Sequence, residues 1–396
     1  MAFSLNPLVS AIEEPPISEA HSWLDGVSFT VEKPLIDLAQ AAPGYPPEEG
    51  LRRFLATAVM EEATSRYTDI EGLPLLRQLL ATDMSETYQG TVSPEQVLIA
   101  AGCNQSFYLT AMTLCRPGDA MLVVSPWYFN HRMTLDMLGV EPVALPARAD
   151  NGFVPDPQDA RRLMTDRVKA ILLISPNNPT GAVYPEQVLQ EFADLAAEQG
   201  IALIVDETYR DFLAPEVSRP HGLIARSGWD SHLIHLYSFS KVYSMTGYRV
   251  GAVVADPVLI TQIAKVMDSL AICAPRIGQL AAIYGLQNLH DWRAGNRQVM
   301  ADRVAAFTAA LEAVESGYEI QSIGAYFAFL RHPFEASSSV IAPALAREAG
   351  LLTLPDTMFG GAGTHLRVAF ANVDGAEMPE VARRLRQFEQ DHAGAR

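Results

Sequence analysis

Short apolar runs alternate with helical patterns through most of the chain. Between the runs, residues 104–114 and 184–199 have the apolar spacing of amphipathic helices, and Gly200 is placed to end the second. Near-continuous apolar strands that are separated by helices indicate a mostly parallel sheet covered on both faces. The runs that predict its seven strands are 96–101, 120–125, 141–146, 169–175, 201–207, 232–240 and 248–255.

The pattern changes after about residue 290. A long helix is predicted at 291–315, and after it come short strands within 318–332, a helix near 338–349, a strand at 365–371 and a final helix at 376–390. This order is typical of an α+β domain, so we expect an α/β protein with a large domain and a smaller α+β domain. The first 50 residues are rich in proline and predict an irregular arm. The expected parts are 1–45 (the arm and part of the small domain), 46–290 (the large domain) and 291–396 (the small domain).

Charge and cysteine content exclude several classes of partner. The chain has 29 Lys and Arg against 46 Asp and Glu, a net charge of -17, so we expect neither nucleic acid nor an anionic membrane as partner. Three cysteines without a metal-binding or paired spacing predict no disulfide framework and no metal site, which suits a reducing cytoplasm. The first residues lack the basic start and apolar segment of a signal peptide. We therefore expect a cytoplasmic protein.

Polar and aromatic residues follow the apolar runs, at the edge where parallel sheets bind ligands. Together they supply an amine, a carboxylate, a phenol, an amide, hydroxyls and a guanidinium. Pyridoxal phosphate needs this set: a lysine for its aldehyde, a carboxylate for its ring nitrogen, and hydroxyls, an arginine and a helix N-terminus for its phosphate. The segments are Gly102–Gln105, Pro126–Tyr128, Pro176–Gly181, Asp206–Tyr209 and Ser238–Lys241, with Arg249 eight residues further on.

Four motifs, SPNNPTG, VDETYRDF, SFSKVYSMTGYRVG and HLRVAFAN, resemble those of the class I/II aminotransferases, which are fold-type I enzymes that depend on pyridoxal phosphate. The resemblance runs from about Asp37 to the last helix. It implies transfer of an amino group from an amino acid to a 2-oxo acid by a ping-pong mechanism. It also implies that Lys241 forms the Schiff base and moves the proton, and that Asp206 pairs with the ring nitrogen. Tyr209 and Asn178 resemble the pair that binds the ring oxygen.

The remaining site residues also follow from the resemblance. The phosphate is expected to contact Arg249, Ser238, Ser240 and the backbone N–H groups of Cys103 and Asn104. Tyr128 is expected to stack on the cofactor ring, with Trp127 as the alternative. Arg367 is expected to bind the substrate α-carboxylate, with Ala41 and Asn178 also touching the substrate. Plainer interpretations stay open: Arg367 in a structural ion pair, Asn178 as a turn residue, and Asp206 as a helix cap.

The resemblance further predicts a homodimer. Tyr67 resembles a tyrosine that reaches the phosphate in the neighbouring subunit, so each site would be built from two chains. The chain departs from the family pattern at Asp356, where a glycine is common, and in the arm at 40–44. The Gly-rich run 359–363 precedes a strand, so it predicts no dinucleotide site. Five histidines show no metal-ligand spacing and are interpreted as structural: His21, His131, His221, His232 and His235.

Other functions fit the same scaffold, because a fold does not determine a reaction. The alternatives are C–S lysis, β-elimination or oxidation with the same cofactor, or a protein that binds it without catalysis. The substrate side chain is not readable from the motifs. Arg276 or Asp268 could recognise a charged side chain in the partner's site, whereas Trp127, Phe129 and Tyr326 favour an apolar or aromatic one.

Overall fold

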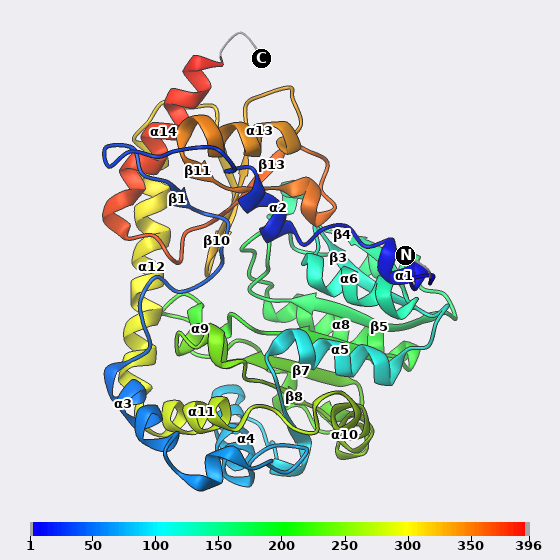
Figure 1. Cartoon of the computed structure of the whole chain (residues 1–396). Coiled ribbons are helices and arrows are strands. Elements are labelled where there is room, and N and C mark those ends of the chain that lie inside the picture. The colour runs from blue at the N-terminus through cyan, green and yellow to red at the C-terminus, as the bar shows by residue number, and fades with distance from the viewer. Residues whose placement is uncertain (1–2, 393–396) are drawn as a thin grey trace.

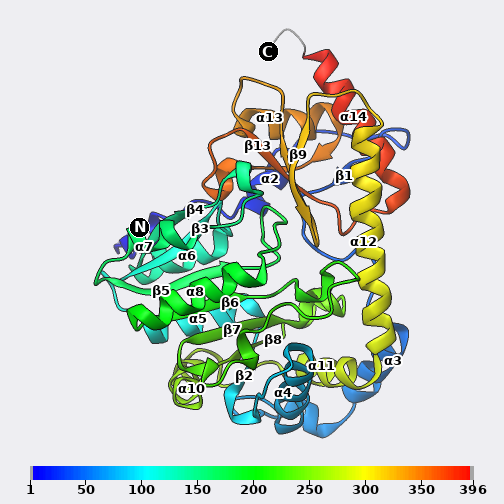
Figure 2. The same cartoon turned by 180° about the vertical axis from the view of Figure 1, so that it is seen from behind.

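The central sheet has seven strands in the order β2-β8-β7-β6-β5-β3-β4, as the computed structural model of residues 3–392 shows (Figures 1 and 2). All neighbours are parallel except at β8, which runs antiparallel to both β2 and β7. The predicted mostly parallel sheet is confirmed. The strands are β2 (Val97–Ala100), β3 (Ala120–Ser125), β4 (Glu141–Pro146), β5 (Val168–Ile174), β6 (Ala202–Asp206), β7 (Leu233–Ser238) and β8 (Gly251–Val254).

Helices cover both faces of this sheet (Figures 1 and 2). In α8, Leu189, Phe192, Leu195 and Ala196 are buried at spacings of three and four, which is the apolar stripe predicted from the sequence. Gly200 ends α8 in the left-handed conformation with φ +63°. The large-domain helices are α3 (Glu49–Ala58), α4 (Pro74–Tyr88), α5 (Cys103–Leu114), α6 (Phe129–Leu138), α7 (Pro157–Leu163), α8 (Glu186–Gln199), α9 (Phe239–Val242), α10 (Pro257–Ala271) and α11 (Arg276–Asn288).

A second, four-stranded antiparallel sheet lies beyond α12 (His290–Glu312), which runs along the molecule from the large sheet to the small one (Figure 2). Its strands follow the order β12-β13-β10-β9, which places β13 between two neighbours. The elements are β9 (Glu319–Gly324), β10 (Phe327–Arg331), β12 (Leu354–Pro355), β13 (His365–Ala369), α13 (Ser338–Ala344) and α14 (Met378–Asp391). The predicted α+β character of this region is confirmed.

The N-terminal arm is more ordered than its proline content predicted. It forms α1 (Pro7–Ser10) and α2 (Pro16–Ser22), and β1 (Ile36–Asp37) pairs in parallel with β11 (Leu351–Leu352). Proline fits the first turn of a helix, where its missing N–H is not needed, so Pro7 and Pro16 begin helices here. The arm therefore belongs in part to the small-domain layer.

Three apolar clusters hold the molecule together. One packs around the large sheet, a second lies within the small domain, and a third joins α2 to both. The third contains Ala20 of the arm, Phe129 of α6, and Leu352, Leu354 and Phe359 of the small domain. The domain boundaries at 45/46 and 290/291 stay predictions. Within residues 3–392, no helix combines the length and the apolar character needed to cross a membrane.

Candidate active site

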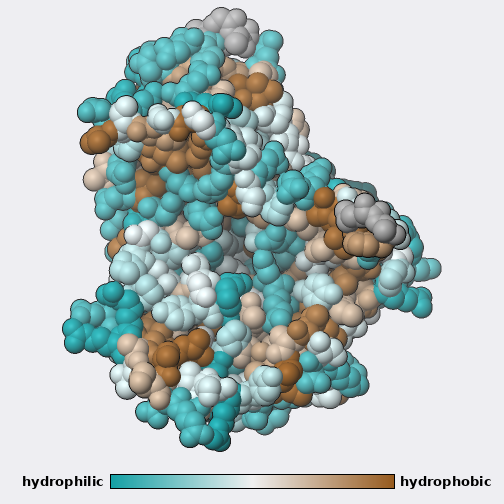
Figure 3. Space-filling model, viewed as in Figure 1, coloured by the Kyte–Doolittle hydropathy of each residue, from teal (hydrophilic) through white to brown (hydrophobic). Residues whose placement is uncertain are grey.

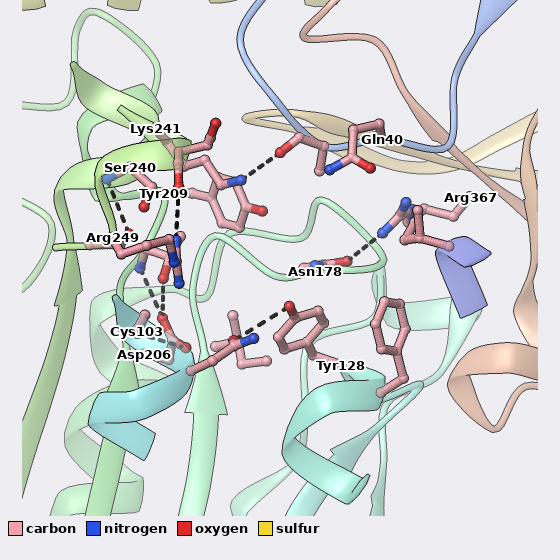
Figure 4. Close-up of a pocket in the computed structure, with 18 residues that line it drawn as sticks. Gln40, Cys103, Tyr128, Asn178, Asp206, Tyr209, Ser240, Lys241, Arg249 and Arg367 are labelled. Carbon is pink, nitrogen blue, oxygen red and sulfur yellow. Dashed lines mark hydrogen bonds between the residues drawn. The ribbon is translucent and has the colours of Figure 1, made fainter. Parts of the chain in front are cut away.

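A cavity of about 170 Å³ lies where β5, β6 and β7 end, between the two domains (Figure 4). The carboxyl ends of parallel strands meet at this edge, so segments far apart in sequence converge on it. Apart from Tyr67, every site residue expected from the sequence lines the cavity: Ala41, Cys103, Asn104, Tyr128, Asn178, Asp206, Tyr209, Ser238, Ser240, Lys241, Arg249 and Arg367. Phe129, which the sequence offered as a contact for an apolar substrate side chain, also lines the cavity. Residues that sequence reasoning did not assign line it too, among them Ile17, Gln40, Thr208 and Thr246.

Lys241 lies in α9, directly after β7, and its ammonium group points into the cavity (Figure 4). Its Nζ donates a hydrogen bond to the carbonyl oxygen of Ala41 at 2.5 Å. Removal from water, together with the charges of Arg249 and Arg367, lowers the pKa of Lys241 to about 8. A neutral amine is therefore accessible near neutral pH, as a nucleophile or base requires.

Asp206 ends β6 and is buried at the floor of the cavity. Its Oδ1 accepts hydrogen bonds from the N–H and hydroxyl of Thr208 at 3.0 and 2.8 Å, and its Oδ2 lies 3.3 Å from Nε2 of His131. Burial alone would raise the pKa of this carboxyl, but His131 and then Thr208 outweigh that effect and hold the pKa below its usual range. Asp206 therefore stays negatively charged.

His131 was interpreted from the sequence as a structural histidine, but it is a direct neighbour of Asp206. Its ring also lies 5.1 Å from the ring of Tyr128, in an edge-on arrangement. The sequence held one signal for this position. His131 follows Tyr128 by three residues at the start of a helix, and residues at that spacing share a face.

The end of the cavity near Arg249 is rich in donors. Helix α5 begins at Cys103, where the first backbone N–H groups have no partner inside the helix and carry its positive dipole end. Arg249 donates to the carbonyls of Thr246 and Ala101 at 3.0 and 3.3 Å. Gly102 has φ +86°, and a Cβ there would lie 2.2 Å from Nη2 of Arg249. Only glycine lets the arginine come this close to the helix N-terminus.

The structure also bears on the reactivity of the Cys103 thiol and on the choice between Tyr128 and Trp127 as the residue that stacks on the cofactor ring. Burial, with the charge of Asp206, raises the pKa of the Cys103 thiol, so this group is not an activated nucleophile. Tyr128 lines the cavity, and its hydroxyl accepts a hydrogen bond from Asn130 Nδ2 at 2.8 Å. Trp127 lines a neighbouring hollow instead, with the Arg132 guanidinium 4.8 Å from its ring centre. The geometry favours Tyr128 over Trp127 as the ring-stacking residue.

Arg367 lies on β13 and reaches the cavity from the small domain (Figure 4). It is only 1% exposed, donates to Asn178 Oδ1 at 3.2 Å and to the carbonyl of Ala39, and its Nε has no hydrogen-bond partner. Burial lowers its pKa to about 10. Within residues 3–392 no carboxylate forms an ion pair with it, so the plainer interpretation of a structural ion pair finds no partner here. A buried guanidinium without a counterion suits an anionic ligand.

Tyr67 lies outside the cavity of its own chain and is 73% exposed. Its backbone carbonyl accepts a hydrogen bond from Arg276 at 3.4 Å, and neither Arg276 nor Asp268 lines the cavity. The role of Tyr67 in a neighbouring subunit stays a prediction. In the part of the chain that the structure describes, no group of three or more His, Cys, Asp or Glu side chains could hold a metal ion.

Comparison with known proteins gives one consistent result. A sequence model of the family "Aminotransferase class I and II" matches residues 32–385. An aromatic aminotransferase of Arabidopsis thaliana is 29% identical over 359 residues, which cover 89% of each chain. The aspartate/prephenate aminotransferase of Thermus thermophilus is 28% identical over 371 residues, 91% of this chain and 90% of that one.

Solved structures agree with the sequence comparison. The aspartate aminotransferase of Thermus thermophilus with maleate superposes with a TM-score of 0.88 at 26% identity and covers 97% of this chain and 99% of that one. The chain is therefore an aminotransferase that belongs to the class I and II family.

Proposed function

We propose that this aminotransferase uses pyridoxal phosphate and transfers amino groups between amino acids and 2-oxo acids in two half-reactions. The observation that carries the proposal is the charge of the cavity. Lys241, Arg249 and Arg367 line it, and none of them forms an ion pair with a described residue. Asp206, the one carboxylate among the described residues that line it, already has His131 and Thr208 as partners. Such a site favours anions, namely a phosphate and a carboxylate.

The residues present fit the cofactor at both ends. Arg249, Ser238, Ser240 and the N-terminus of α5 supply the donors that a phosphate needs. Asp206 remains charged at the floor, where it can hold a proton on a ring nitrogen. When bound, pyridoxal phosphate supplies an aldehyde that condenses with amines and a ring that accepts an electron pair.

The chain's own groups then have distinct tasks. Arg367 binds the substrate α-carboxylate and fixes the orientation of the Cα–H bond. Lys241, once neutral, removes the proton from the substrate Cα and would then deliver it to the carbon that came from the cofactor aldehyde, on the other side of the amino nitrogen. Oδ1 of Asn178 accepts a hydrogen bond from Arg367, so the N–H₂ group of the Asn178 amide remains available as a donor. This group and the hydroxyl of Tyr209 could both donate to a ring oxygen of the cofactor.

The proposal extends to a homodimer with shared sites in the cytoplasm. Apolar side chains are exposed beside Tyr67, including Val59 at 61% and Met60 at 83%, and Figure 3 shows apolar surface over α3 and α11. Thr68 N–H contacts Sγ of Cys273 at 3.4 Å, which places Tyr67 next to the junction of α10 and α11. Arg249 and Asn104 are exposed in the single chain, which leaves room for a donor from a second one. Three unpaired cysteines suit a reducing compartment.

The decisive experiment is a single half-reaction. The holoenzyme is mixed with an amino donor and no acceptor, and the cofactor is analysed after acid release. Transamination yields one equivalent of pyridoxamine phosphate and one of 2-oxo acid, and added 2-oxo acid reverses the change. Release of ammonia or hydrogen sulfide without pyridoxamine phosphate would instead assign a lyase or elimination reaction.

The shared site is tested by mixing chains. In a hybrid of Lys241→Ala and Tyr67→Phe chains, one site contains both Lys241 and a partner tyrosine, and the other contains neither. We expect Tyr67→Phe dimers to bind the cofactor more weakly and hybrids to recover tight binding in half of the sites. A monomer that keeps full activity on dilution would contradict the shared site.

A further inference from the structure

The cations of the cavity are few and each has a defined place. Arg249 lies at the end near α5, Lys241 lies in the middle and Arg367 lies at the opposite end (Figure 4). If the cofactor phosphate takes Arg249, its aldehyde takes Lys241 and the substrate α-carboxylate takes Arg367, then no lining cation is left. The lining residues of the described chain contain no histidine and no further lysine or arginine. A second substrate carboxylate would therefore find no counterion on its own chain in this cavity.

The walls beside Arg367 are apolar. Ile17 of α2 and Phe129 of α6 both line the cavity. Phe129 is buried, with its ring 5.5 Å from that of Phe359 and 5.0 Å from that of Tyr128. The Phe359 ring in turn lies 5.1 Å from the guanidinium of Arg367. A substrate held by Arg367 therefore meets aromatic and aliphatic groups close to its carboxylate.

The hollow next to the cavity continues this character. It shares Phe129 with the cavity and contains Ile12, Trp127, Met133 and Met358. Its one cation, Arg132, is paired with Asp136 at 3.3 Å and stacks on Trp127. Glu13 and Glu14 of the arm add negative charge to the same hollow. An acidic side chain that extended past Phe129 would be repelled rather than bound.

We propose that the substrates of this enzyme are amino acids with an uncharged, apolar side chain and that Ile17 and Phe129 select them. This inference rests on the proposed function, because it takes Arg367 as the α-carboxylate site. Apolar side chains gain by leaving water against Ile17 and Phe129. A carboxylate in the same place is desolvated without a partner on this chain, and that penalty disfavours aspartate and glutamate.

The first test compares amino donors in the half-reaction described above. We expect kcat/KM for leucine, methionine and phenylalanine to exceed that for aspartate and glutamate by about 100-fold or more. Preference for the acidic donors would overturn the inference and leave the aminotransferase proposal intact, since the cation would then come from another chain. Failure of every donor to form pyridoxamine phosphate would overturn both.

A second test does not depend on turnover. Unreactive analogues are titrated against the holoenzyme and followed by the change in cofactor absorbance. We expect 4-methylpentanoate and 3-phenylpropanoate to bind more tightly than succinate or maleate, although the dicarboxylates carry more charge. Tighter binding of the dicarboxylates would contradict the apolar site.

The specificity residues are tested by Ile17→Arg and Phe129→Leu. A cation at residue 17 supplies the missing partner, so we expect the ratio of kcat/KM for glutamate over leucine to rise at least about tenfold. Phe129→Leu should lower kcat/KM for phenylalanine more than for alanine. The matched control is Val9→Arg, which places the same charge on the exposed α1 of the same arm, outside the cavity. An equal shift in Ile17→Arg and Val9→Arg would show a general charge effect and overturn the role of Ile17.

Discussion

The two ends of the active-site cavity carry arginines in opposite surroundings. Arg249 is exposed, belongs to the large domain and is held by two backbone carbonyls beside the N-terminus of α5. Arg367 is almost fully buried, belongs to the small domain and contacts Asn178 and the arm. In the proposed function, many donors would share the binding of a phosphate at the first end. At the second end, recognition would rest on one desolvated cation, Arg367, which lies between Phe327 of one apolar cluster and Phe359 of another.

Because the two ends differ, substitutions at one end should affect cofactor binding and substitutions at the other should affect substrate binding. Loss of one donor at the Arg249 end should weaken cofactor binding in a graded way. Loss of Arg367 should leave the cofactor in place and remove substrate recognition. Lys241 and Asp206 lie between the ends, and the proposed mechanism gives them the chemical steps, so their loss should have the largest effects on turnover.

Lys241→Ala is expected to lower turnover by about 10⁴-fold or more, because the chain loses both its amine and its general base. The protein should still fold and bind the cofactor without a covalent bond, since the donors at the Arg249 end are untouched. The measurements are kcat and covalent trapping of cofactor with borohydride. Trapping at the wild-type level would show that another lysine holds the cofactor.

Asp206→Asn is expected to slow removal of the Cα proton by about 10²–10³-fold, because a neutral residue no longer holds charge opposite a ring nitrogen. Stopped-flow measurement of the half-reaction reports this step directly. Cofactor retention should change much less than the rate. A near-normal rate would mean that Asp206 serves only as the helix cap considered from the sequence.

Arg367→Ala and Arg249→Ala test whether the two ends of the cavity have different tasks. Loss of Arg367 should cost about 2–5 kcal/mol in kcat/KM for amino acids while the dissociation constant of the cofactor stays the same. Loss of Arg249 should do the reverse and weaken the cofactor. Equilibrium dialysis and steady-state kinetics on both variants separate the two effects. If Arg367→Ala loses its cofactor while KM is unchanged, the assignments of the two ends are exchanged.

His131→Ala is expected to lower kcat about tenfold or more, because the carboxylate of Asp206 loses a hydrogen-bond donor. His131 holds the pKa of Asp206 down, so its removal raises that pKa. Activity on the acid side should therefore be lost at a higher pH than in the wild type. The control is His232→Ala, whose ring contacts the carbonyl of Ile201 and lies outside the cavity. An unshifted pH profile would return His131 to the structural role assigned from the sequence.

Reconstitution of the cofactor-free chain should depend on pH through Lys241. Its pKa is lowered to about 8, so the neutral amine increases as pH rises toward that value and then levels off. The rate of covalent cofactor binding should rise about tenfold per pH unit below 8 and become flat above it. Absorbance during reconstitution at several pH values measures this. A midpoint near the ordinary lysine pKa would show that Arg249 and Arg367 do not act on Lys241.

The large sheet and the residues that line the cavity at its strand ends could be predicted from the sequence for physical reasons. Buried parallel strands require continuous apolar runs, and ligand-binding residues must follow them, so Asp206 and Lys241 could be located directly. The antiparallel direction of β8 could not be predicted, because a fully buried strand has the same composition in either direction. The pairing of β1 with β11 joins segments more than 300 residues apart, and no local pattern encodes it.

His131 and Ile17 show a second limit to predicting site residues from the sequence. Each lies on a helix whose polar and apolar spacing fits ordinary packing, and its contact with the site depends on how that helix is placed. His131 reaches Asp206 only because α6 packs beside α5, and Ile17 reaches the cavity only because α2 bridges the domains. Residues brought to a site by tertiary packing leave a weaker trace in sequence than those at strand ends.

Helix α12 connects the two domains that carry Arg249 and Arg367 at the two ends of the cavity. Its first turns are pinned to the large domain, where Arg293 forms ion pairs with Asp83 at 2.7 Å and Asp211 at 2.5 Å, and Arg297 donates to the carbonyl of Leu213 at 2.8 Å. Its last turns pack against α14 of the small domain. With 23 residues, the helix is about 35 Å long, so a tilt of about 5° at the pinned end displaces the other end by about 3 Å. That distance is the length of one hydrogen bond, so a tilt of this size would be enough to bring Arg367 onto a carboxylate with every backbone hydrogen bond within α12 kept.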